Sequence, residues 1–294
     1  MASSNASQRI SLQNVLFVSD FSESSIAALP YAIAVSLHYK GKVFLAHVVS
    51  PEMYEFLPPE SLELTREQIA GYAERRMRQL IKDARFRGVP HEGIVKTGEV
   101  WDTLSGLADK HNIDLIVVGT RGRRGLKKLL MGSVAAEIIQ LARRPVLTVG
   151  PQTGAIQPER ELHTIIYATD FSTDLVRARA LAISLAQEFG ARLISVHVAP
   201  QESEDPQSRT RFEEYYAERL RELIPPTPRL QQEYRVEFGF PAEGILKAAA
   251  ESKADLILIG VHGSGALARA DDYLGSTAQR VLALAPSPVL TIRG

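Results

Sequence analysis

A glycine-rich segment in the first half of the chain has the residue types of an anion-binding loop. Gly119-Thr-Arg-Gly122 is followed, after nine intervening residues, by Gly132-Ser133. Glycine lets a backbone approach a ligand closely, and a helix N-terminus offers unpaired N–H groups and the positive end of its dipole. The charged side chains between the outer glycines are all basic: Arg121, Arg123, Arg124, Lys127 and Lys128. These features predict a phosphate site at the start of a helix.

A purely structural explanation of the same residues stays open at this point. Glycines also end strands, and a serine after a glycine is an ordinary helix N-cap. The segment is not a Walker A loop, because no Gly-Lys-Ser/Thr closes it, and its glycine spacing is not that of dinucleotide-binding proteins.

The elements that must position this loop alternate between strand and helix. The run Asp114-Leu-Ile-Val-Val-Gly119 is typical of a strand buried on both faces. Periodicity predicts strands over Asn14–Ser19, Lys42–Val49, Gly93–Lys96, Leu115–Val118 and Val146–Val149, and helices over Glu23–Tyr39, Glu60–Arg87, Val100–Lys110 and Ser133–Arg143. Strict alternation requires parallel strands joined by right-handed helical crossovers. We therefore expect a doubly wound α/β domain with a five-stranded parallel sheet.

Ligands of such sheets bind at the carboxyl ends of the strands, where the strand order changes direction. Asp20 follows the first strand and Val48 ends the second, so both join the glycine loop as candidates. Asp20 could equally close the first helix in a capping box, with Glu23 reaching back. His47 lies in an apolar run without an accompanying acid or nucleophile, which favours a packed histidine over a catalytic one.

The second half of the chain repeats the first. Val15-Leu-Phe-Val-Ser-Asp20-Phe-Ser returns as Ile165-Ile-Tyr-Ala-Thr-Asp170-Phe-Ser, and Asp114-Leu-Ile-Val-Val-Gly returns as Asp255-Leu-Ile-Leu-Ile-Gly260. The segment between the halves is rich in glycine, proline and polar residues, as surface linkers are. We predict an N-terminal domain over 1–150, a linker over 151–162 and a C-terminal domain over 163–294.

Composition excludes several classes of protein. The 294 residues hold 34 basic and 34 acidic side chains, so net charge gives no case for a nucleic-acid or anionic-membrane partner. The chain has no cysteine, which excludes disulfides and thiolate metal sites and fits a cytoplasmic protein. No apolar stretch is long enough to span a bilayer. We expect a soluble protein.

Taken together, these motifs resemble the universal stress protein family, in its ATP-binding subgroup. Asp20-Phe-Ser, Gly119-x2-Gly122-x9-Gly132-Ser133 and Pro145-Val-Leu-Thr-Val carry the resemblance, and the repeat suggests a tandem member. The resemblance implies an adenine nucleotide α-hydrolase-like fold with ATP as ligand, alone or with Mg²⁺. It assigns adenine to Asp20 and Val48, and ribose and phosphates to Gly119, Gly122, Gly132, Ser133 and Val134. It also implies pairing of domains through their fifth strands, as an intramolecular pseudo-dimer or a homodimer.

The second half departs from the family pattern. Asp170, Val198, Gly260, Gly263, Gly275 and Ser276 are the corresponding candidates, but eleven residues separate Gly263 from Gly275. Arg269 is the one basic residue of that loop, against Asp271 and Asp272. Ser276-Thr-Ala-Gln279 also has capping-box spacing, which would explain Ser276 without a ligand.

Two classes of function follow from the sequence. The first is a regulatory module of the stress response that senses or sequesters ATP. The alternative is an ATP-using enzyme with slow hydrolase or phosphotransferase activity. Phosphoryl transfer needs metal-binding acids and a placed base, and the sequence identifies no catalytic residue and no metal ligand. The regulatory interpretation is therefore favoured.

Overall fold

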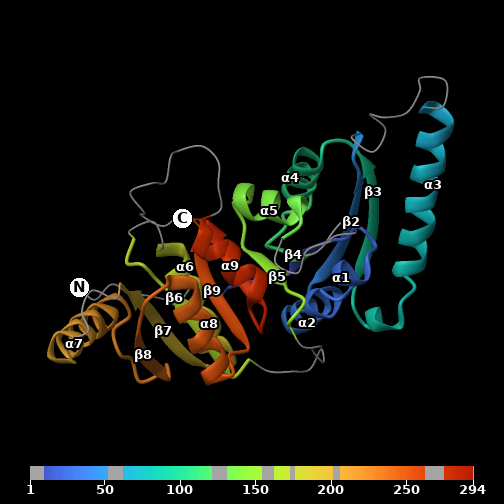
Figure 1. Ribbon diagram of the computed structural model, residues 1–294. Coiled ribbons are helices and arrows are strands. Elements are labelled where there is room, and N and C mark those ends of the chain that lie inside the picture. The colour runs from blue at the N-terminus through green and yellow to red at the C-terminus, as the bar shows by residue number, and fades with distance from the viewer. Residues whose placement is uncertain are drawn as a thin grey trace. The chain divides into compact units, whose positions relative to one another are not determined.

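Strand and helix alternate along the chain of the computed structural model, as the sequence predicts (Figure 1). The structure describes residues 10–51, 62–120, 131–153, 162–172, 176–200, 206–261 and 275–293. The chain forms two units, of which the first holds Leu12–Pro151 and the second Glu161–Gly294.

The first unit is a doubly wound parallel sheet. Its elements are β1 (Asn14–Val18), α1 (Glu23–Ile26), α2 (Leu29–Tyr39), β2 (Lys42–Val49), α3 (Leu62–Leu80), η3 (Ala84–Phe86), β3 (His91–Thr97), α4 (Val100–Lys110), β4 (Leu115–Gly119), α5 (Ser133–Leu141) and β5 (Val146–Val149). The strand order is β3-β2-β1-β4-β5. Val18 is in register with Ala46 of β2 and Val118 of β4, so the ends of these strands lie level.

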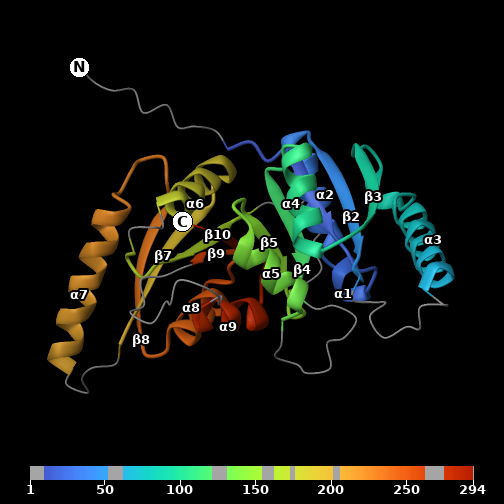
Figure 2. The ribbon, with the colours of Figure 1, turned by 90° about the horizontal axis from the view of Figure 1, so that it is seen from above.

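Helices cover both faces of this sheet. Figure 1 shows α3 on one side of β2 and β3 and α4 and α5 on the other, and Figure 2 gives the same elements from above. The helix α2 packs against β1 and β2. The strands β1 and β4 in the middle are almost fully buried, because both of their faces are covered. The sequence prediction of a doubly wound α/β fold is confirmed.

The predicted helix over Glu23–Tyr39 is in fact two helices. Pro30 is the second residue of α2, and proline has no N–H to donate to the carbonyl of Ile26, four residues earlier. The hydrogen-bond ladder therefore breaks between Ile26 and Leu29. The short α1 is left directly after Asp20, where it supports the candidate site.

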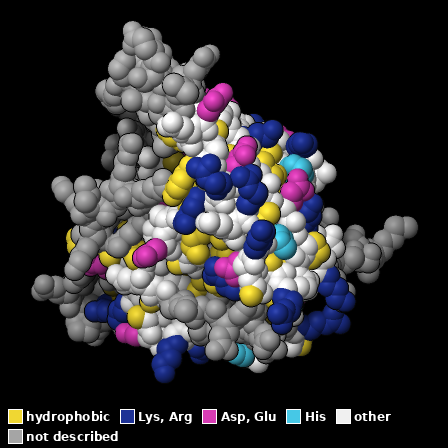
Figure 3. All heavy atoms as spheres, turned by 90° about the vertical axis from the view of Figure 1, so that its right-hand side faces the viewer, with side chains coloured by type: hydrophobic (Ala, Val, Ile, Leu, Met, Phe, Trp, Pro, Cys, Tyr) yellow, Lys and Arg dark blue, Asp and Glu magenta, His cyan; other side chains and the backbone are white. Residues whose placement is uncertain are grey.

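The helix α3 has one buried and one exposed side. Its Ala73 and Met77 are buried against the sheet, whereas Arg75 and Arg78 are exposed. Figure 3 views the side of the first unit that carries α3 and shows many basic side chains there, with acidic ones among them. The predicted helix to Arg87 ends earlier, at Leu80, and η3 begins anew with Asp83 as N-cap, accepting from the Arg85 N–H at 2.9 Å.

The second unit repeats the architecture. Its elements are β6 (Thr164–Ala168), α6 (Val176–Phe189), β7 (Arg192–Ala199), α7 (Pro206–Leu223), β8 (Gln232–Phe238), α8 (Pro241–Ser252), β9 (Leu256–Val261), α9 (Ser276–Leu284) and β10 (Val289–Arg293). The strand order is β10-β9-β6-β7-β8, again all parallel. Among the helices of the described ranges, none has the length and apolar composition needed to cross a membrane.

Candidate functional site

The candidate site of the first unit lies where the strand order changes direction. From β1 the chain continues to β2 on one side, and from β4 it continues to β5 on the other. The turns that leave β1 and β4 therefore diverge at the carboxyl edge of the sheet, which is where doubly wound sheets bind ligands. Asp20 lies two residues after the end of β1 and Gly119 ends β4, with Val48 near the end of the adjacent β2.

Asp20 forms a tight turn with Ser22. Its Oδ1 accepts hydrogen bonds from the Ser22 N–H at 3.0 Å and the Ser22 hydroxyl at 2.6 Å. Ser22, and not Asp20, is the N-cap of α1, since its Oγ accepts from the Ser25 N–H at 3.2 Å. The capping-box interpretation of Asp20 is wrong. Asp20 lies two residues before the N-cap, and its carboxylate accepts hydrogen bonds from the capping residue Ser22.

The middle residue of this turn, Phe21, has left-handed backbone geometry, with φ of 61°. Its N–H donates to Ser19 Oγ at 3.0 Å, and its buried ring lies 4.4 Å from the His47 ring between centroids. His47 Nδ1 lies 2.7 Å from the Ser19 carbonyl oxygen, which can only accept, so Nδ1 carries the proton. His47 thus supports the turn from the neighbouring strand.

Gly119 has a packing reason to be glycine. A Cβ at this position would lie 2.6 Å from the carbonyl oxygen of Ser24 and 3.0 Å from the Cα of Ser25. The end of β4 therefore touches the backbone of α1 directly. The clearance that the sequence suggested for a phosphate serves protein packing at this residue.

The glycine loop begins and ends at one hydrogen bond. The Gly132 N–H donates to the Thr120 carbonyl at 2.8 Å, and the Thr120 N–H donates to the Val149 carbonyl at 3.0 Å. Gly132 is the N-cap of α5 and makes no side-chain cap, while Ser133 and Val134 are exposed in the first turn. Gly122 and the five basic residues of the loop lie outside the described residues.

The second unit reproduces the turn at its own strand ends. Asp170 Oδ1 accepts from the Ser172 N–H at 2.9 Å, and the Phe171 N–H donates to Thr169 Oγ1 at 3.0 Å. Phe171 is also left-handed, with φ of 62°. The His197 ring again lies against the phenylalanine ring, tilted, at 4.5 Å between centroids, and its Nδ1 lies 2.9 Å from the Thr169 carbonyl oxygen.

Burial lowers the pKa of His197. The Thr169 carbonyl that accepts from the ring works in the opposite direction, the Arg219 guanidinium lowers the pKa further, and Asp170 raises it. The net result is a pKa below the ordinary value, so the imidazole is neutral at pH 7. The Thr169 carbonyl oxygen can only accept, so the neutral ring carries its proton on Nδ1.

The remaining candidates of the second unit lie at the same edge. Val198 is half-buried beside α8, where a Cβ on Gly244 would lie 2.7 Å from Val198 Cγ2. Gly260 is near the end of β9, and Gly275 is the N-cap of α9. Ser276 is therefore the first helical residue, and its capping-box interpretation is wrong. Gly263, Arg269, Asp271 and Asp272 lie outside the described residues.

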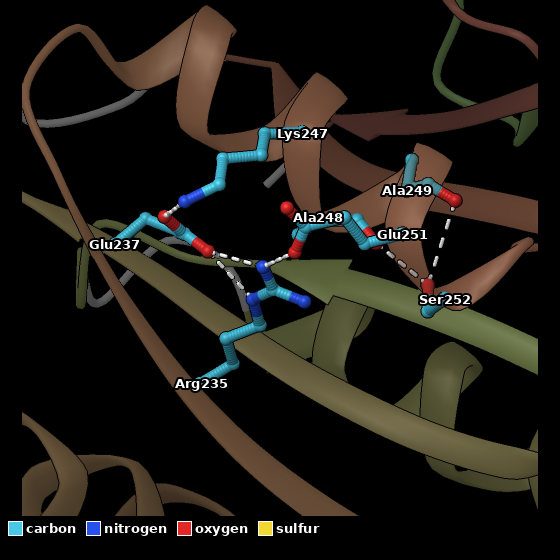
Figure 4. Close-up of polar contacts among 7 residues, drawn as sticks. All are labelled: Arg235, Glu237, Lys247, Ala248, Ala249, Glu251 and Ser252. Atoms are coloured by element: carbon cyan, nitrogen blue, oxygen red, sulfur yellow. Dashed lines mark hydrogen bonds and ion pairs between the residues drawn. The ribbon is translucent and has the colours of Figure 1, made fainter.

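A second group of charged residues lies between β8 and α8 (Figure 4). Glu237 is only 8% exposed and accepts from Arg235 Nε at 2.6 Å and Lys247 Nζ at 3.0 Å. Arg235 also pairs with Glu251. Burial opposes the charge of Arg235, but the two carboxylates outweigh it and raise its pKa, while the pKa of Glu251 is lowered by Arg235. The charges compensate one another, as in a structural ion-pair network.

Sequence reasoning missed the residues that support the turns from other elements. Ser19 and Thr169 receive the phenylalanine N–H groups, and Arg76 and Arg219 reach the same phenylalanines from α3 and α7. The one sequence signal for Ser19 and Thr169 is that a hydroxyl residue precedes the aspartate in both halves of the chain. Within the described ranges, no three His, Asp or Glu side chains gather in a way that could hold a metal ion.

Comparison with known proteins gives one consistent family. The sequence model of the Universal stress protein family matches the chain twice, over residues 11–150 and 161–293. A universal stress protein of Mycolicibacterium smegmatis is 25% identical over 286 residues, 93% of this chain and 95% of that protein. One of Thermus aquaticus is 40% identical over 137 residues, 44% of this chain and 98% of that protein. The crystal structure of a universal stress protein from Archaeoglobus fulgidus has the same fold, with a TM-score of 0.70 at 22% identity, covering 97% of this chain and 99% of that one.

Proposed function

Because the chain belongs to the universal stress protein family, with one family domain in each unit, we propose that it is a regulatory protein that senses or sequesters ATP. The observation that carries the proposal is the juxtaposition at the switch point of the first unit. There the Asp20 turn follows β1, and the hydrogen bond between Gly132 N–H and the Thr120 carbonyl joins the two ends of the glycine loop after β4. Both lie at the same edge of the sheet. Nucleotides bind at this place in doubly wound sheets.

The residues divide into a base side and a phosphate side. Asp20 and Val48 bind adenine, while Gly119, Gly122, Gly132, Ser133 and Val134 hold ribose and phosphates. The first turn of α5 directs backbone N–H groups toward the loop, and these groups suit an anion. Mg²⁺, where it accompanies ATP, supplies charge neutralisation at the phosphates.

Binding, and not catalysis, fits the state of Asp20. Its Oδ1 already accepts two hydrogen bonds from Ser22, so the carboxylate is held as a fixed acceptor. A fixed acceptor recognises a donor of the ligand, whereas a general base must reach the proton that it removes. We therefore propose that nucleotide binding changes the conformation of the protein or the partners that it binds.

The test is calorimetric titration of ATP into the full chain and two matched variants, Gly132→Val and Gly275→Val. Gly132 has φ of −62° and ψ of 145°, which a branched residue adopts, so the fold should survive while the side chain blocks the phosphates. We expect Gly132→Val to remove the tighter binding event and Gly275→Val to remove at most the weaker one. Unchanged binding by Gly132→Val with an intact circular dichroism spectrum would refute the site.

The two units should bind ATP unequally. The first loop has five basic side chains, whereas the second has Arg269 with Asp271 and Asp272. One carboxylate ~6 Å from a phosphate charge repels it by about 0.7 kcal/mol in water and about 3 kcal/mol at an effective dielectric of ~20. The second unit should therefore bind several-fold to a hundred-fold more weakly, at about 1.4 kcal/mol per factor of ten. Repeating the titration with Mg²⁺ tests this, because stronger binding by the second unit only with metal would identify the aspartates as metal ligands.

A further inference from the structure

In the second unit, the helix α7 covers the phenylalanine of the Asp170-Phe171-Ser172 turn. The guanidinium carbon of Arg219 lies 4.1 Å from the centre of the Phe171 ring. The Tyr216 ring is nearly parallel to that of Phe171, at 6.2 Å between centroids, and lies 4.5 Å from the His197 ring. Arginine on the face of an aromatic ring is attracted by the ring electrons. Three side chains from two elements thus surround one ring.

Phe171 needs such support because its backbone is strained. A φ of 62° costs free energy for any residue other than glycine. Such a residue keeps this conformation only when the surrounding structure enforces it. The two N–H groups of the turn are held locally, because Phe171 N–H donates to Thr169 Oγ1 and Ser172 N–H donates to Asp170 Oδ1. They do not fix the ring. The ring is held from outside, by β7 through His197 and by α7 through Tyr216 and Arg219.

The first unit supports its turn less extensively. Arg76 of α3 lies 5.9 Å from the Phe21 ring and donates to the Phe21 carbonyl at 3.5 Å. The residue three positions earlier is Ala73 in α3, but Tyr216 in α7. The residues after the two arginines, Met77 and Leu220, are both buried, which places the helices in the same register. Tyr216 is therefore an addition in the second unit.

We propose that Arg219, together with Tyr216, is a positioning residue that fixes the Asp170 turn through the Phe171 ring. The carboxylate of Asp170 is exposed at the strand end, so the position of the turn decides where it meets a ligand. A preorganised carboxylate binds better because less freedom is lost on binding. That this ligand is a nucleoside rests on the proposed function.

Amide hydrogen exchange of the full chain tests the proposal without a ligand. The Phe171 and Ser172 N–H groups exchange only when the turn opens, so their rates report its stability. We expect Arg219→Ala and Tyr216→Ala to accelerate both amides roughly 3–10-fold, the range of an arginine–aromatic contact. Arg219→Lys, which keeps a cation over the ring, should restore part of the protection. Arg221→Ala is the control, because Arg221 lies on α7 but faces Tyr234 at 5.8 Å.

The outcomes separate a positioning role from general destabilisation. Exchange of the β6 amides, such as that of Tyr167, should stay unchanged in Arg219→Ala. Equal acceleration throughout β6, equal acceleration in Arg221→Ala, or no acceleration at Phe171 and Ser172 would each overturn the proposal.

Adenosine then serves as the probe of the base side. In the wild type it should protect Ser172 further, and Arg219→Ala should weaken its affinity for this unit several-fold, with partial rescue by Arg219→Lys. If adenosine protects no amide of the wild type, the proposed nucleotide function of this unit fails. In that case, amide exchange of Phe171 and Ser172 without adenosine would still test whether Arg219 positions the turn. Arg219→Ala could instead accelerate exchange of the Phe171 and Ser172 amides and leave the affinity for adenosine unchanged. That result would overturn the claim that the position of the turn controls ligand binding.

Discussion

At the scale of single residues, both units use one strained phenylalanine to shape the end of the first strand. Phe21 and Phe171 have nearly the same φ, of 61° and 62°, and both N–H groups donate to a hydroxyl two residues earlier. A histidine on the next strand contacts each ring in a tilted arrangement and donates from Nδ1 to the carbonyl of that hydroxyl residue. The recurrence of a costly conformation with its full set of supports indicates that it shapes the site.

Gly119 and Gly106 make a matched pair for testing the packing role of glycine. Gly119→Ala should destabilise the first unit by about 1–3 kcal/mol, because its Cβ would lie 2.6 Å from the Ser24 carbonyl. Gly106→Ala should stabilise by about 0.5–1 kcal/mol, since Gly106 is inside α4 and a Cβ there meets nothing within 4 Å. Urea unfolding measures both, and equal stability of the two variants would contradict the packing argument.

His197 should make the stability of the second unit depend on pH. Burial, with help from Arg219, lowers the pKa of His197 below its value of 6.5 in the unfolded chain. The unfolded state therefore takes up a proton first as the pH falls. The contribution of the neutral ring is complete above pH 6.5 and is lost as the pH falls from there through the lowered folded pKa.

Urea unfolding between pH 7.5 and pH 5 checks this sign in His197→Gln, with His163→Gln as the control at an exposed position. His197→Gln should lose part of the decline in stability toward low pH that the wild type shows. A decline of the same size in wild type and His197→Gln would show that other groups cause it.

At the scale of elements, the ion-pair network ties the outermost strand of the second unit to α8. Glu237 is buried and accepts from two cations, whereas Glu243 pairs with Arg280 at 2.9 Å where both side chains are more than half exposed. Glu237→Gln should cost about 1–3 kcal/mol, because it removes one of the two carboxylates that compensate the largely buried Arg235 guanidinium. Glu243→Gln should change stability by less than about 0.5 kcal/mol.

Denaturant midpoints of the two variants decide between burial and simple pairing. Similar losses would mean that the buried network contributes no more than a surface pair does. A larger loss for Glu237→Gln would identify the network as the element that secures β8 to α8.

At the scale of the whole molecule, the prediction concerns the fifth strand of each unit. Within its own unit, each of β5 and β10 has a neighbouring strand on one side only, so the N–H and C=O groups on its other side need partners. We expect Val146–Val149 and Val289–Arg293 to pair, as the family resemblance implies, and to exchange their amides slowly in the intact protein. The strand β3, the outermost strand of the first unit on the side away from β5, is the internal reference. Its amides should exchange faster than those of β5. Rapid labelling of both fifth strands would contradict the pseudo-dimer.

The sequence alone determined the elements and the repeat. Periods of two and 3.6 residues are local properties, so β2, α4 and β5 were predicted with the bounds that the structure has. Alternation of strand and helix then required a parallel doubly wound sheet, and that sheet brings Asp20 and Gly119 to one edge. The Asp-Phe-Ser and glycine motifs indicated the family because their residues are adjacent or closely spaced.

Only the tertiary structure decided what each of these residues contacts. Nothing near Gly119 in the sequence reveals that Ser24 packs against it, and nothing near Phe171 reveals Arg219. Ser22 and not Asp20 caps α1, and Phe21 between them has a left-handed conformation that local propensity disfavours. The side chains that contact its ring, His47 and Arg76, come from β2 and α3. Contacts between residues far apart in the chain depend on how the helices pack across the sheet, and no local pattern encodes that packing.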